Sequence, residues 1–128
     1  MKTFLTLVAA LALAAAAHAA PFPDITITEL KAAIENKQVT LLDVNGTVSY
    51  QGGHIPSAMD YTAVKQNLAK VLPKDKNALV VAYCGGPACG AYQAAAKAAK
   101  DLGYKNVKHL AAGISGWKEA KETLEKAN

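Results

Sequence analysis

Arginine is absent from this 128-residue chain, so every one of its 14 positively charged side chains is a lysine. The chain therefore lacks the guanidinium fork that binds phosphate or carboxylate through two parallel hydrogen bonds. The lysines are spread singly along the sequence, which indicates a solvated surface rather than a nucleic-acid interface. We expect no nucleic-acid partner.

Cysteine is also scarce, because Cys84 and Cys89 are the only two, with four residues between them. A disulfide between them would close a very small ring and would do little to link distant parts of the chain. The cysteines and histidines do not have the spacing of a compact zinc site, and no nucleotide-binding glycine motif is present, so we expect no metal and no cofactor. The spacing of the two thiols therefore favours chemistry over scaffolding.

Long apolar runs are limited to the amino terminus. Lys2 precedes an apolar stretch from Phe4 to Ala17, and Ala17-His18-Ala19 has the small residues of a cleavage site. An uncleaved membrane anchor is the alternative, but the run is shorter than the ~20 apolar residues that a span requires. We expect residues 1–19 to be a Sec-type signal peptide cleaved after Ala19. Residues 20–128 would then form one domain, periplasmic or secreted and free of the membrane.

The rest of the sequence alternates between strand and helix patterns, which predicts an α/β fold with a central parallel sheet of about five strands and helices on both faces. The expected strands are 38–44, 59–61, 78–83 and 106–110. A capping box of Thr26 and Glu29 predicts a first helix over Ile27–Glu35. Further helical segments are expected near 48–51 and over 63–71. A helix after the cysteines is expected to bury an apolar stripe of Ala91, Ala94, Ala95, Ala98 and Leu102. A last helix is expected to point Ile114, Trp117 and Leu124 inward.

The two cysteines belong to the segment CGGPAC, residues 84–89, directly after the most apolar of the predicted strands. Ligands of open α/β sheets bind beyond the carboxyl ends of the strands. Gly85 and Gly86 allow the loop to turn its N–H groups inward as an anion-binding nest, and the next helix adds positive potential. We expect this setting to lower the pKa of the Cys84 thiol and make it a nucleophile, although a small buried apolar role is the alternative.

Four segments together resemble the single-domain rhodaneses, a family of sulfurtransferases. They are LLDVNGTVSYQGGHIPSAMDY, VVAYC, CGGPAC and LGYKNVKHLAAGISGW. The resemblance covers nearly the whole predicted domain and implies a rhodanese-like fold. It also implies that Cys84 takes sulfane sulfur from a small donor, thiosulfate or polysulfide, as a persulfide and passes it to a thiol or cyanide acceptor. The loop that holds the persulfide or a substrate anion would comprise Gly85, Gly86, Pro87, Ala88, Cys89 and Gly90.

The chain departs from the family pattern at three positions. Gly85 and Cys89 stand where the family often has an arginine and a basic or hydroxyl residue, and Asn45 replaces the arginine of a DVR segment. A thiosulfate anion would lose charge-assisted hydrogen bonds worth about 1.5–3 kcal/mol each. We therefore expect weak activity with thiosulfate and a neutral or polymeric sulfur donor. A phosphatase is rejected, because its longer loop would need an arginine near Gly90.

Cys89 and Asp43 are the remaining candidates for the site. Cys89 is either a resolving thiol that attacks a Cys84 persulfide and releases sulfide, or a residue that only packs at the start of the next helix. Asp43, at the end of its strand, either orients the loop or caps a turn. His54 is interpreted as a structural residue.

Two alternatives to the sulfurtransferase stay open: a non-catalytic domain that binds an anion or an acidic partner, and a thiol–disulfide redox protein.

Overall fold

The structure is a computed structural model that describes residues 21–127, so the predicted signal peptide lies outside the described residues. Its parallel sheet has the strand order β2-β1-β3-β4. The strands are β1 (Thr40–Asp43), β2 (Met59–Asp60), β3 (Leu79–Tyr83) and β4 (Asn106–His109). The α/β fold is confirmed, and the expected number of about five strands is approximate: residues 21–127 form four strands and an isolated parallel bridge between Asp24 and His109.

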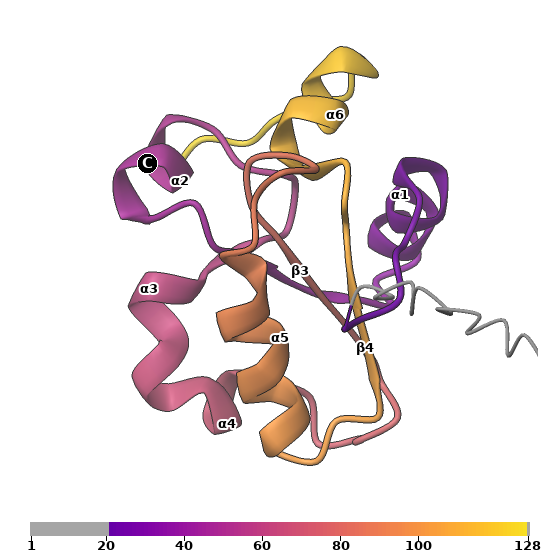
Figure 1. The fold of residues 1–128 in the computed structure, drawn as a ribbon, viewed down its shortest axis with the longest axis vertical. Helices are drawn as coiled ribbons and strands as arrows, with labels where there is room; N and C mark the ends of the chain where they lie inside the picture. Colours follow the sequence, from indigo (N-terminus) through magenta and orange to yellow (C-terminus); the bar gives the residue numbers. More distant parts are fainter. Residues whose placement is uncertain (1–20, 128) are drawn as a thin grey trace, which may run out of the picture.

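Within residues 21–127, six short α-helices surround the sheet (Figure 1). They are α1 (Ile27–Glu35), α2 (Thr47–Gly52), α3 (Tyr61–Val64), α4 (Leu68–Val71), α5 (Tyr92–Asp101) and α6 (Gly113–Glu119). The capping box of α1 is confirmed: Thr26 Oγ1 accepts from the Glu29 N–H at 3.1 Å, and the Glu29 carboxylate accepts from the Thr26 N–H at 2.9 Å. The single helix expected over 63–71 is instead divided by a 3₁₀ turn, where Asn67 leaves helical geometry at φ −123° and ψ 24°.

Successive side chains of the central strands point to opposite faces of the sheet, which creates two apolar layers. Leu41, Val81 and Tyr83 face one layer, which α1 and α6 complete with Leu30 and Trp117. Their neighbours Leu42, Val80 and Ala82 face the other layer, which includes side chains of α4 and α5. Helices thus cover both faces, as expected, because a strand buried on both sides places successive side chains in opposite layers.

The buried face of α5 is shifted by about one residue from the apolar stripe predicted for it. Its buried residues are Tyr92, Ala95, Ala96 and Ala99, whereas Ala91 and Ala94 are exposed, Ala98 is partly buried and Leu102 is 37% exposed. In an alanine-rich helix several stripes have suitable spacing, so the one bulky apolar side chain decides the rotation. Tyr92 is that side chain, because its ring packs against Phe22 and His109.

The carboxyl-terminal segment is tied to the turn that contains His54. The helix α6 ends at Glu119, and Leu124 lies beyond it while still packing against the core. Backbone hydrogen bonds join the His54 N–H to the Glu125 oxygen at 2.8 Å and the Glu125 N–H to the His54 oxygen at 2.9 Å. The ring of His54 stacks on Tyr50 and its Nδ1 is 2.8 Å from the Tyr50 carbonyl oxygen, which agrees with a structural role. No helix within residues 21–127 is long and apolar enough to cross a membrane.

Candidate active site

Cys84 is the first residue after β3, at the carboxyl edge of the sheet. Its side chain is buried, with 3% of its surface exposed. A disulfide joins it to Cys89 across a Cα–Cα distance of 6.3 Å and closes the six-residue loop. The structure therefore presents the loop in its oxidised form, in which the Cys84 sulfur is covalently capped by Cys89.

The first residues of α6 contact the cysteine loop through backbone hydrogen bonds. The N–H groups of Ile114 and Ser115 donate to the carbonyl oxygens of Cys84 and Gly85, each at 2.9 Å. Gly113 has φ +61°, and a Cβ atom built there would lie 2.5 Å from the Gly86 nitrogen. Glycine is required here both for the left-handed backbone and for this close approach. The position of the loop is thus set by α6 as well as by β3.

The backbone N–H groups of the cysteine loop differ in whether they make a hydrogen bond. The Cys89 N–H donates to the Gly86 oxygen at 3.0 Å, so it is engaged within the oxidised loop. Within residues 21–127, the N–H groups of Gly85, Gly86, Ala88 and Gly90 make no backbone hydrogen bond. Pro87 has no N–H to offer. Within the described residues, Cys89 is thus the loop residue whose N–H has a backbone partner, and the anion-binding role of the other amides stays a prediction.

A cavity of about 250 Å³ lies between the loop and the end of β4. Its lining residues are Pro21, Cys84, Gly86, Pro87, Ala88, Cys89, Gly90, Tyr92, Gln93, His109, Leu110 and Ala111. This set contains both cysteines but no lysine and no carboxylate, so it offers no full positive charge to an anionic ligand. Among the described residues, no cluster of three or more His, Cys, Asp or Glu side chains is placed to hold a metal ion.

Asp43 is fully buried but does not line this cavity. Its carboxylate accepts hydrogen bonds from the Tyr83 hydroxyl at 2.5 Å and from the Asn45 N–H at 2.8 Å. The second bond is the turn cap that the sequence left open as an alternative. The first connects Asp43 to the residue that directly precedes Cys84, so its carboxylate reaches the loop only through Tyr83.

Besides the cysteines, His109 and Tyr92 are the titratable residues of the cavity, and the sequence analysis assigned neither to a site. The β3–β4 register pairs His109 with Ala82, two residues before Cys84, and Tyr92 begins α5 shortly after Cys89. The carboxyl ends of neighbouring parallel strands meet at one edge, which was the available signal for His109. Tyr92 was missed because the rotation of α5 was predicted incorrectly.

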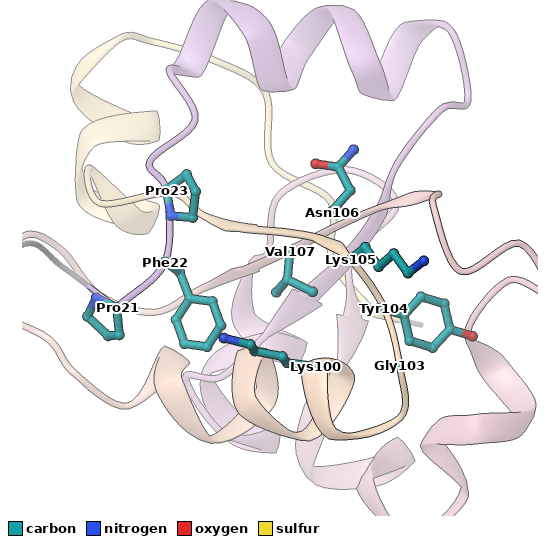
Figure 2. Close-up of a pocket in the computed structure, with 9 residues that line it drawn as sticks. All are labelled: Pro21, Phe22, Pro23, Lys100, Gly103, Tyr104, Lys105, Asn106 and Val107. Carbon is teal, nitrogen blue, oxygen red and sulfur yellow. The ribbon is translucent and has the colours of Figure 1, made fainter.

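A larger cavity of about 470 Å³ lies at the opposite end of β4 and α5 (Figure 2). Figure 2 shows the Phe22 ring beside Lys100, whose Nζ is 5.9 Å from the ring centroid. Lysines, prolines and Tyr104 line this cavity, but it contains neither a thiol nor a carboxylate. Size alone therefore does not identify the reactive site; the cysteine pair does.

Comparison with known proteins assigns the chain to a family. Residues 26–120 match the rhodanese-like domain, a span that includes the whole cysteine loop. The chain belongs to the rhodanese-like family. The match extends from the capping box of α1 through α6, so it covers all four strands of the sheet.

Three relatives illustrate the range of this family. The HTH-type transcriptional regulator Rv0324 of Mycobacterium tuberculosis is 37% identical over 102 residues, which are 78% of this chain and 43% of the regulator. The structure of BH2092 from Bacillus halodurans has 26% identity and a TM-score of 0.64, covering 81% of this chain and 77% of that one. A thiosulfate sulfurtransferase from Pseudomonas aeruginosa has 23% identity and a TM-score of 0.67, covering 81% of this chain and 20% of that one. The rhodanese-like chain thus spans less than half of the regulator that it resembles.

Proposed function

We propose that this rhodanese-like protein is a sulfurtransferase that carries sulfane sulfur as a persulfide on Cys84. The observation that carries the proposal is the position of Cys84, buried at the end of β3 and yet part of the wall of a cavity. Strand ends of α/β sheets are where such folds bind ligands. Family membership supports the same chemistry, since sulfurtransferases share this fold.

The proposed cycle begins with the reduced loop. An external dithiol reduces the Cys84–Cys89 disulfide, and the Cys84 thiolate then attacks the sulfane sulfur of a donor. The bond between that sulfur and the rest of the donor breaks, leaving a Cys84 persulfide and a donor shortened by one sulfur atom. A thiol or cyanide acceptor then attacks the outer sulfur and regenerates the Cys84 thiolate.

The cavity favours a neutral or polymeric sulfur donor, such as polysulfide, over thiosulfate. None of its lining residues is a lysine, so its polar groups are uncharged ones, such as the loop amides and the side chains of Gln93 and His109. A persulfide or polysulfide disperses its charge over large sulfur atoms, so it depends less on a charge-assisted hydrogen bond than the sulfonate oxygens of thiosulfate do. Thiosulfate is therefore expected to be a poor donor.

A second activity is favoured by the disulfide itself. Because Cys89 is within bonding distance of Cys84, its thiol is placed to resolve the persulfide and release sulfide. Without a sulfur donor, the same pair would act as a thiol–disulfide redox centre. We further propose that the protein is exported after cleavage at Ala19, into a compartment where such a disulfide persists.

Two serine variants test the proposal. The reduced wild-type protein is loaded with polysulfide, freed of excess donor and then mixed with cyanide, and thiocyanate is measured. Cys84→Ser should abolish thiocyanate formation, whereas Cys89→Ser should retain it and lose only the release of sulfide. No thiocyanate from the wild-type protein with any sulfane donor would contradict the enzyme and favour a binding domain. Loss with either variant would favour the redox function.

A further inference from the structure

His109 is a buried polar residue in the wall of the cysteine cavity. Its side chain is 6% exposed, and its Nδ1 has no hydrogen-bond partner among the described residues. Leaving a buried polar atom unpaired costs about 1–3 kcal/mol. His109 lines the same cavity as Cys84 and Cys89, so a ligand or a reacting thiol in that cavity is the available partner for its imidazole.

The imidazole is held in position from several sides. Its ring stacks on Tyr92, with 4.2 Å between ring centroids and 26° between ring planes. On the backbone, the His109 N–H donates to the Pro23 oxygen and its own oxygen accepts from the Ile25 N–H, each at 2.9 Å. Tyr92 in turn meets Phe22 edge to face at 6.4 Å. The orientation of the ring is therefore fixed by packing rather than by a hydrogen bond to Nδ1.

The burial of His109 favours its neutral form. Burial lowers the pKa of His109 from the ordinary value of 6.5, and the charge of Asp24 opposes this effect. The Asp24 carboxylate already accepts a hydrogen bond from the Ala111 N–H at 2.8 Å. The other titratable groups of the cavity are Tyr92 and the two cysteines. A neutral imidazole has one nitrogen that accepts a proton and one that donates, so it suits proton transfer at neutral pH.

We propose that His109 accepts the proton of the Cys89 thiol during resolution of the Cys84 persulfide and returns it to the departing sulfide. This inference rests on the proposed function. The Cys89 sulfur, once deprotonated, bonds to Cys84 Sγ, and the bond from Cys84 Sγ to the outer sulfur breaks. The outer sulfur takes the electron pair and the proton from His109 and leaves as HS⁻. Two cysteine sulfurs are oxidised to the disulfide while one sulfane sulfur is reduced, so no further oxidant is required.

A single-turnover experiment tests the proton transfer. Reduced protein is loaded with polysulfide, freed of excess donor, and followed for sulfide release from pH 5 to 8. In the wild type, the rate should fall at low pH as His109 becomes protonated. His109→Gln should load Cys84 normally but release sulfide about 100-fold more slowly near pH 7, the scale typical of acid–base catalysis. Its remaining rate should simply rise with pH, as expected for a thiol that ionises without help.

His54→Gln is the matched control, since His54 is also a buried histidine but does not line the cavity. It should release sulfide at the wild-type rate with the wild-type pH profile. A His109→Gln protein that behaves in the same way would overturn the proposal.

A second measurement does not depend on any persulfide. NMR titration of the His109 imidazole is compared in the oxidised protein and after reduction with dithiothreitol. If His109 faces the thiols, its pKa should change when the disulfide opens; identical curves would overturn the proposal. If Cys84 never acquires sulfur, the sulfurtransferase proposal fails. If the pKa of His109 nevertheless changes on reduction, the proximity of His109 to the thiols is supported independently.

Discussion

The Tyr83 hydroxyl donates a 2.5 Å hydrogen bond to the Asp43 carboxylate between the last residues of two adjacent strands. Both side chains are fully buried, and the same hydroxyl accepts a hydrogen bond from the Ile55 N–H at 3.0 Å. Burial, together with the Asp43 carboxylate, strongly raises the pKa of Tyr83, so the phenol stays protonated and continues to donate. Because Cys84 follows Tyr83 directly, this bond fixes the point at which the cysteine loop begins.

Replacing Tyr83 with phenylalanine should therefore destabilise the protein. Tyr83→Phe leaves the Asp43 carboxylate and the Ile55 N–H without this partner, and we expect the free energy of unfolding to fall by about 2–3 kcal/mol. Urea unfolding followed through the fluorescence of Trp117 measures this change. Tyr61→Phe is the control, because the Tyr61 hydroxyl makes only an exposed 3.4 Å contact with the Ala94 oxygen. Equal losses in both variants would contradict the role given to Tyr83.

Gly113→Ala should disturb the cysteine loop. The added Cβ would lie 2.5 Å from the Gly86 nitrogen, and the left-handed backbone at φ +61° adds about 1–2 kcal/mol of strain for any other residue. Gly103→Ala provides a comparison, since Gly103 has φ +95° but no atom within 4 Å of an added Cβ. Both variants should unfold at lower urea concentrations, but only Gly113→Ala should lose sulfur transfer from polysulfide to cyanide. Full transfer activity in Gly113→Ala would show that the loop does not depend on α6.

Gly85→Arg should improve the use of thiosulfate. The backbone of Gly85 lies outside the left-handed region, and the nearest atom to an added Cβ is Asn45 Oδ1 at 3.9 Å, so the site tolerates a side chain. A charge-assisted hydrogen bond of about 1.5–3 kcal/mol corresponds to an increase in kcat/KM of about 10- to 100-fold. Gly85→Gln controls for bulk without charge. No gain from arginine over glutamine would argue against a missing cation as the reason for weak thiosulfate activity.

The stability of the protein should decrease in acid partly because of His109. Its pKa in the folded state lies below the ordinary value of 6.5, mainly because of burial, so the unfolded chain binds a proton more readily. Stability is therefore lost as the pH falls from about 6.5 toward the folded-state pKa. Comparison of urea midpoints at pH 7.5 and pH 5 should show a smaller acid loss in His109→Gln than in the wild type. An equal loss in the two proteins would exclude His109 as a source.

Patterns along the sequence were sufficient for the fold class and for the elements with local signals. The capping box of Thr26 and Glu29 located α1, and the apolar run before Cys84 located β3, because both signals are local. The rotation of α5 was not local, since it depends on the contact of Tyr92 with Phe22 and His109.

The candidate site likewise has features that are local in the sequence and features that depend on the folded chain. The cysteine loop is continuous in sequence and was found there, whereas its disulfide depends on a Cα separation that only the folded chain defines. His109 joins the cavity through the register of β3 and β4, which sequence patterns alone do not specify.

Mass spectrometry of the reduced protein after brief exposure to polysulfide tests the central claim most directly. The sulfurtransferase proposal predicts that Cys84 gains one sulfur atom, that Cys89→Ser retains this adduct, and that a thiol or cyanide removes it. A Cys84 that stays unmodified while the protein remains folded and reduced would contradict the claim.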